Sequence, residues 1–70
     1  MVGMSFLEFN CLEDIQMFCN KNSYKIITND GVSIIANVYN KNNALVGYIS
    51  NSSKDFRCKN KETKYVLVWE

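Results

Sequence analysis

A chain of 70 residues is long enough for one small domain, and we expect residues 1–70 to form a single unit with a modest core. Hydrophobic residues make up 47% of the chain and charged residues 21%, which excludes a disordered chain because enough apolar surface is present to offset the entropy lost on ordering. The formal net charge of +1 excludes both a polyanionic mimic and a polycationic protein.

The first elements in chain order are a short strand and a helix. The segment "MSFLEF" predicts an N-terminal strand that pairs at an edge of a sheet. Residues 11–20 predict a helix, because Asn10 is a favourable N-cap and Glu13 follows it in a capping-box pattern. The apolar residues of this segment recur at intervals of three and four, as on one face of a helix; they are Cys11, Leu12, Ile15, Phe18 and Cys19.

The rest of the chain predicts strands joined by turns. "YKIIT" precedes "NDG", in which Gly31 supplies the positive φ of a short hairpin loop. "VSIIANVY" and "ALVGYIS" flank the loop "NKNN", whose asparagines tolerate turn geometry. "DFRCK" and "KYVLVWE" flank "NKET" and predict a last hairpin, with Phe56 and Cys58 opposite Leu67 and Tyr65.

Alternation across the central hairpin predicts the face that forms the core. A loop at residues 40–43 places Val38 opposite Leu45, Ala36 opposite Gly47 and Ile34 opposite Ile49, and it gives one face without polar side chains. We expect that face to receive the helix. It comprises Val32, Ile34, Ala36, Val38, Leu45, Gly47 and Ile49, to which the preceding hairpin adds Tyr24 and Ile26.

These patterns predict an α+β fold. The expected architecture is an antiparallel β-meander of about five strands with the helix at residues 11–20 packed on one face and an additional N-terminal edge strand. The alternative is a small closed β-barrel with one helix, since closure removes exposed strand edges.

The opposite face of the sheet is more apolar than a solvated face requires. Apolar patches rimmed by charge often mark contact sites, so we predict a partner-binding surface there. Barrel closure, which would bury the same residues, is the alternative explanation. The predicted partner-binding residues are Ile35, Tyr39, Val46, Tyr48, Arg57, Lys59 and Lys64. Ile27, Val66 and Val68 are expected on the same face.

Catalysis has little support in the sequence. The chain has no histidine, which removes the commonest general base and metal ligand. Cys11, Cys19 and Cys58 lack the spacing of a zinc site, and buried, reduced thiols are the default for such residues in a reducing compartment. We therefore expect no enzyme, no catalytic residue, no metal and no cofactor.

These expectations favour a non-enzymatic protein-interaction module. The compact, motif-free chain, rich in Asn, Lys and Ile, is typical of phage- or mobile-element-encoded inhibitors that bind and occlude a larger host protein. One alternative is a small nucleic-acid-binding protein that uses Tyr39 and Tyr48 near Arg57, Lys59 and Lys64; another is a homodimer or other homo-oligomer. The segment "MVGMSFLEF" does not show the charged start and long apolar stretch typical of a signal peptide, and no apolar run reaches about 20 residues, so we expect a cytoplasmic protein without a membrane partner.

Overall fold

The computed structural model of the protein describes residues 5–69, which form one five-stranded antiparallel sheet with one α-helix and one short 3₁₀-helix. The predicted α+β class is therefore confirmed. The elements in chain order are β1 Ser5–Phe9, α1 Leu12–Lys21, β2 Lys25–Thr28, β3 Ile34–Tyr39, β4 Leu45–Ser50, the 3₁₀-helix η1 Ser53–Asp55 and β5 Tyr65–Trp69.

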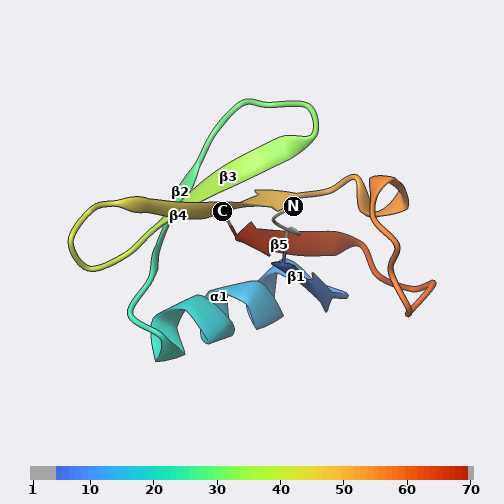
Figure 1. Cartoon of the computed structure of the whole chain (residues 1–70), viewed down its shortest axis with the longest axis horizontal. Helices are drawn as coiled ribbons and strands as arrows, with labels where there is room; N and C mark the ends of the chain where they lie inside the picture. The colour runs from blue at the N-terminus through green and yellow to red at the C-terminus, as the bar shows by residue number, and fades with distance from the viewer. Residues whose placement is uncertain (1–4, 70) are drawn as a thin grey trace.

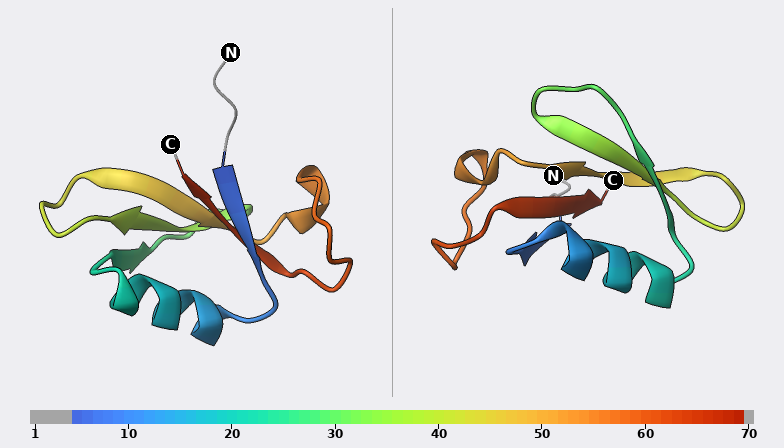
Figure 2. Two further views of the ribbon diagram at one scale, coloured as in Figure 1. Left: turned by 60° about the horizontal axis from the view of Figure 1, so that its bottom comes forward. Right: turned by 180° about the vertical axis from the view of Figure 1, so that it is seen from behind.

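The strand order in the sheet is β1-β5-β4-β3-β2, and the sheet is open (Figure 1). Strands β2 to β5 form the predicted meander, and β1 pairs with β5 as the predicted N-terminal edge strand. The alternative of a closed barrel is wrong, because β1 and β2 lie at opposite edges and do not pair with each other. Figure 2 shows α1 along one side of the sheet, with η1 and the β3–β4 loop at opposite ends.

Helix α1 lies one residue further along the chain than the sequence predicts. The expected cap at Asn10 is wrong: Cys11 is the N-cap residue, its backbone is extended, and no side chain caps the helix. Glu13 and Asp14 still lie in the first turn, where their negative charges interact favourably with the helix dipole. At the other end, the Nδ2 group of Asn22 donates a hydrogen bond to the carbonyl oxygen of Phe18 at 2.8 Å and helps to end the helix.

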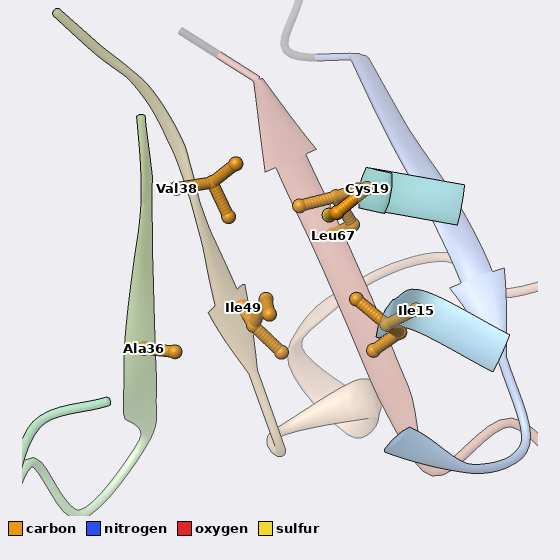
Figure 3. Close-up of a cluster of buried hydrophobic side chains, with 6 residues drawn as sticks. All are labelled: Ile15, Cys19, Ala36, Val38, Ile49 and Leu67. Carbon is orange, nitrogen blue, oxygen red and sulfur yellow. The ribbon is translucent and has the colours of Figure 1, made fainter. Parts of the chain in front are cut away.

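The core lies between α1 and the sheet (Figure 3). Its fully buried members come from the helix and three central strands: Ile15, Cys19, Ala36, Val38, Ile49 and Leu67. Aromatic rings extend this core, since the ring of Phe18 lies 6.0 Å from that of Phe9 and 5.9 Å from that of Trp69. The predicted helix stripe is thus correct at its centre and wrong at its start, where Cys11 and Leu12 are exposed.

The predicted register of the central hairpin is wrong by two residues. Val38 lies opposite Gly47 and Ala36 opposite Ile49, because β3 and β4 contain two irregularities of pairing. One irregularity leaves Ile35 between paired residues on β3, and the other leaves Val46 between paired residues on β4. Such β-bulges add one residue to one strand and change the face on which the following residues lie.

The two bulges explain which predicted core residues are exposed. Beyond them, Ile34 pairs with Ser50 and Leu45 pairs with Tyr39, so both leave the helix-bearing face. Ile34 is 41% exposed and Leu45 is 51% exposed. Val32 precedes β3, lies outside the sheet and is also exposed, so its expected place in the core is wrong as well.

The β2–β3 connection is longer than predicted, and it requires no positive φ at Gly31. Ile26 consequently pairs with Val38. The β3–β4 loop does follow asparagine chemistry. The Oδ1 atom of Asn40 accepts hydrogen bonds from the backbone N–H groups of Asn42 and Ala44, and Asn43 has a φ of 63°.

The predicted strand at "DFRCK" is wrong. The segment from Asn51 to Lys64 contains η1 and turns, because the edge of β5 that such a strand would need is already occupied by β1. Phe56 instead packs on Phe6, with ring centroids 5.3 Å apart. We call residues 51–64 the covering segment.

Candidate protein-binding surface

The face of the sheet opposite α1 is here called the outer face, and alternation along β1 identifies its members. Because Phe9 packs on the helix residue Phe18, its neighbours Glu8 and Phe6 in the alternation lie on the other side of the sheet. Glu8 pairs with Val66 and Phe6 pairs with Val68, so these two valines also lie on the outer face. On β4 the outer face continues through residues 48 and 50.

In one half of the outer face, over β1 and β5, the central side chains are inaccessible to solvent. Val66 and Val68 are both 0% exposed. The covering segment reaches this half at both outward residues of β1, since the ring of Phe56 packs on Phe6 and the carboxylate of Glu8 binds the same segment. We call this region the covered half.

Glu8 attaches the covering segment to the sheet through three hydrogen bonds. Its Oε1 accepts from the backbone N–H of Asn60 at 2.9 Å and from the hydroxyl of Thr63 at 2.9 Å, and its Oε2 accepts from the backbone N–H of Lys59 at 3.1 Å. These bonds favour the carboxylate and hold the pKa of Glu8 below its ordinary value of 4.5, with the bonds from Asn60 and Lys59 as the largest causes.

The other half of the outer face, over β2, β3 and the start of β4, has no such cover among the described residues. We call it the open half. Ile27 pairs with Asn37, which pairs with Tyr48, and Lys25 pairs with Tyr39, which pairs with Leu45. Ile27 is 49% exposed, Leu45 is 51% exposed, and the two tyrosines are half-buried. Aliphatic and tyrosine side chains thus stand side by side on an accessible surface.

The structure brings together two of the predicted partner-binding residues on this surface, Tyr39 and Tyr48. Ile35 and Val46 lie at the bulges, and both pack against the core cluster. Their hydrophobic character is therefore explained by packing against that cluster.

The three predicted basic residues lie in the covering segment. Arg57, Lys59 and Lys64 are exposed, but the segment follows the end of β4, whereas Tyr39 and Leu45 lie at its start. Tyr39 and the basic residues therefore lie at different ends of β4, whereas Tyr48 pairs with Val68, next to the half that the covering segment reaches.

Two members of the open half, Ile34 and Leu45, were assigned to the core by sequence reasoning. Strict alternation places them on the helix side, and only the bulges turn them outward. At Ile35 the sequence has no glycine that would indicate the change, whereas Gly47 directly follows the bulge residue Val46, and an isolated glycine inside a strand often marks a bulge. Ile27, in contrast, was expected on the outer face, and it is there.

A second apolar feature lies on the helix side, between α1 and the β2 edge. It is a groove with a volume of about 260 Å³. The lining residues are mainly aliphatic: Leu12, Ile15, Gln16, Ile26, Thr28, Ile35, Ala36 and Ile49. Helix α1 thus covers the centre of the sheet and leaves its β2 side accessible.

Two of the three thiol groups, those of Cys19 and Cys58, offer little for nucleophilic chemistry, whereas Cys11 is exposed. Burial raises the pKa of Cys19, and burial followed by the charge of Glu8 raises the pKa of Cys58, so both thiols are held in the protonated form. Within residues 5–69, no three His, Cys, Asp or Glu side chains gather in a way that could hold a metal ion.

No helix in the described part of the chain has the length and apolar character to cross a membrane. Comparison of the chain with protein-family models, curated proteins and solved structures gave no match.

Proposed function

We propose that the protein is a non-enzymatic interaction module that binds a larger protein through the open half of its outer face. The observation that carries this proposal is the difference in cover on one face: Val66 and Val68 are fully dry, whereas Ile27 and Leu45 are about half exposed beside two tyrosines. Aromatic residues are enriched at protein interfaces, and tyrosine combines apolar area with a hydrogen-bonding hydroxyl.

The finer expectation concerns the kind of partner. A small, motif-free chain acts most simply by occluding a surface of a larger molecule, as inhibitors encoded by phages and mobile elements do. The Asn-, Lys- and Ile-rich composition agrees with that class. We therefore propose inhibition of a larger host protein in the cytoplasm.

The test is affinity capture from the native cells, followed by identification of the retained protein and reconstitution with that purified partner. Leu45→Lys and Tyr39→Lys place a charge on the open half and should abolish binding of the identified partner. Met17→Lys is the matched control, because Met17 is 69% exposed on α1 and lies away from the outer face. Unchanged binding by both open-half variants, with the fold retained, would contradict the proposal.

Nucleic-acid binding is the second candidate, and the covering segment is the observation that favours it. Residues 51–64 carry five basic side chains against two acidic ones, and the basic side chains are all exposed: Lys54, Arg57, Lys59, Lys61 and Lys64. Binding of a labelled single-stranded oligonucleotide should then weaken steeply with added salt and on Arg57→Gln with Lys61→Gln. Absence of a salt-sensitive shift would remove this candidate.

A further inference from the structure

The free edge of β2 has backbone groups available for pairing, and the hydrogen bonds to β3 identify which ones. The backbone N–H of Asn29 donates to the carbonyl oxygen of Ile35 at 3.0 Å. In an antiparallel ladder the bonded residues alternate, so Ile27 and Lys25 also bond to β3. The N–H and C=O groups of Ile26 and Thr28 must therefore point away from β3, toward the open edge.

No other hydrogen bond reaches these backbone groups within residues 5–69. The side chains of the same two residues line the 260 Å³ apolar groove beside α1. A strand that pairs with Ile26 and Thr28 places the two residues opposite them on the same face of the sheet. Those two side chains would enter the groove between the β2 edge and the helix residues Leu12 and Gln16.

We propose that β2 is a strand-addition site, at which an extended segment of a protein partner pairs antiparallel with Ile26 and Thr28. Main-chain hydrogen bonds supply affinity in this mode of recognition, and pockets for alternate side chains supply specificity. The groove requires apolar side chains at two positions of the segment, separated by one residue. The inference rests on the proposed function in that the segment belongs to the protein partner.

Charge defines the residues that flank the apolar pair of the added antiparallel segment. Lys25 is exposed at the start of β2, and Asp30 is exposed just beyond its end. An antiparallel segment would accordingly carry a basic residue at its start, near Asp30, and an acidic residue at its end, opposite Lys25. The recognised pattern is basic–any–apolar–any–apolar–acidic, where the apolar residues face Thr28 and Ile26 in that order.

The probe is the hexapeptide Lys-Thr-Val-Thr-Ile-Glu, acetylated and amidated, titrated into the isotope-labelled protein. We expect saturable binding with a Kd at or below about 1 mM. The amides of Ile26 and Thr28 should show the largest decrease in hydrogen-exchange rate on saturation. The peptide with its terminal charges exchanged, and the peptide with serine in place of valine and isoleucine, should each bind at least about tenfold more weakly.

Thr28→Pro tests the edge directly, because proline removes the outward N–H and leaves the ladder to β3 intact. It should weaken peptide binding by about tenfold or more, whereas Thr28→Val, which keeps the N–H, should bind as the unmodified protein does. If Thr28→Pro does not fold, the exchange rates of Ile26 and Thr28 in the unmodified protein still decide the question. Leu12→Gln gives a second test: it places a polar group on an exposed wall of the groove and should also weaken peptide binding.

Failure of this inference differs from failure of the proposed function. Unchanged exchange at Ile26 and Thr28 in the presence of saturating peptide, or no binding at all, would overturn strand addition, while Leu45→Lys would still report on the open half. Protection of the same amides without peptide, accompanied by dimers in sedimentation, would overturn it in favour of a second copy of this chain.

Discussion

The covered and open halves of the outer face are built from the same kinds of residue, but they have opposite exposure. Val66 and Val68 in the covered half are as inaccessible as the residues under α1, whereas Ile27 and Leu45 in the open half remain about half exposed. The difference comes from the covering segment, which packs Phe56 on Phe6 and is bound by the carboxylate of Glu8.

This comparison indicates how a 70-residue chain can extend its core beyond one layer. Helix α1 buries one side of the sheet, and 14 irregular residues bury half of the other side. Backbone hydrogen bonds attach the segment at its two ends, from Asn51 to Ser33 and from Lys64 to Phe9, and between these ends Phe56 and Glu8 hold it against the sheet. Substitutions in the two halves should then differ greatly in how much they lower the free energy of unfolding.

The largest effect is expected at the centre of the covered half. Val66→Asp places a carboxylate at a fully buried position, and it should destabilise the protein by about 4 kcal/mol or more, which is close to the whole stability of a domain of this size. Ile27→Asp makes a similar change in the open half and should cost no more than about 1 kcal/mol. Urea denaturation followed by circular dichroism measures the free energy of unfolding of both variants. Equal losses of stability would contradict the difference in burial between the two halves.

A smaller loss is expected for Phe56→Ala. Phe56 is half-buried, so loss of its packing on Phe6 should lower the free energy of unfolding by about 2 kcal/mol, less than removal of a fully buried ring. Met17→Ala, on the exposed side of α1, is the control and should change stability by less than about 0.5 kcal/mol. A cost for Phe56→Ala as small as that of the control would show that the segment does not cover the valines in solution.

Glu8 makes the attachment of the covering segment dependent on pH. The folded-state pKa of Glu8 lies below its unfolded value near 4.5, so its contribution to stability is present above that value and is lost as pH falls through the lower, folded-state pKa. Glu8→Gln should therefore have a lower free energy of unfolding than the unmodified protein at pH 7. The difference between the two free energies should become smaller below pH 4.5.

The matched control for this measurement is Glu62→Gln. It removes the same charge from an exposed position of the covering segment and leaves the three hydrogen bonds of Glu8 in place. Its free energy of unfolding should follow that of the unmodified protein from pH 7 to pH 3. A difference between Glu8→Gln and the unmodified protein that stays constant over this range would exclude protonation of Glu8 as the cause.

Sequence periodicity was sufficient for the helix, the meander and the buried positions Ala36, Val38 and Ile49, because these depend on local alternation. Periodicity predicted the wrong conformation for the covering segment, where contacts between residues far apart in the sequence determine the structure. Nothing near Glu8 in the sequence indicates that its carboxylate binds residues about 52 positions away, and this contact, together with Phe6, determines the conformation of the covering segment.

The candidate surface was predicted in part, for a related reason. The prediction that Tyr39 and Tyr48 lie on the outer face is correct, because no bulge residue interrupts alternation from Ala36 to Tyr39 on β3 or from Gly47 to Ile49 on β4. Ile34 and Leu45 lie beyond the bulges and were therefore placed on the wrong face. A bulge depends on how two strands pair, and the residues of one strand alone do not specify it.

The smallest effect is expected at Leu45, and it tests whether the open half is accessible in the free protein. Because Leu45 is 51% exposed, Leu45→Thr should change the free energy of unfolding by no more than about 0.5 kcal/mol at any protein concentration. A larger loss that grows with concentration would mean that a second copy already covers this surface, since association stabilises the folded state by mass action. Parallel sedimentation of both proteins distinguishes these outcomes, and a monomer with unchanged stability leaves the open half available to another protein.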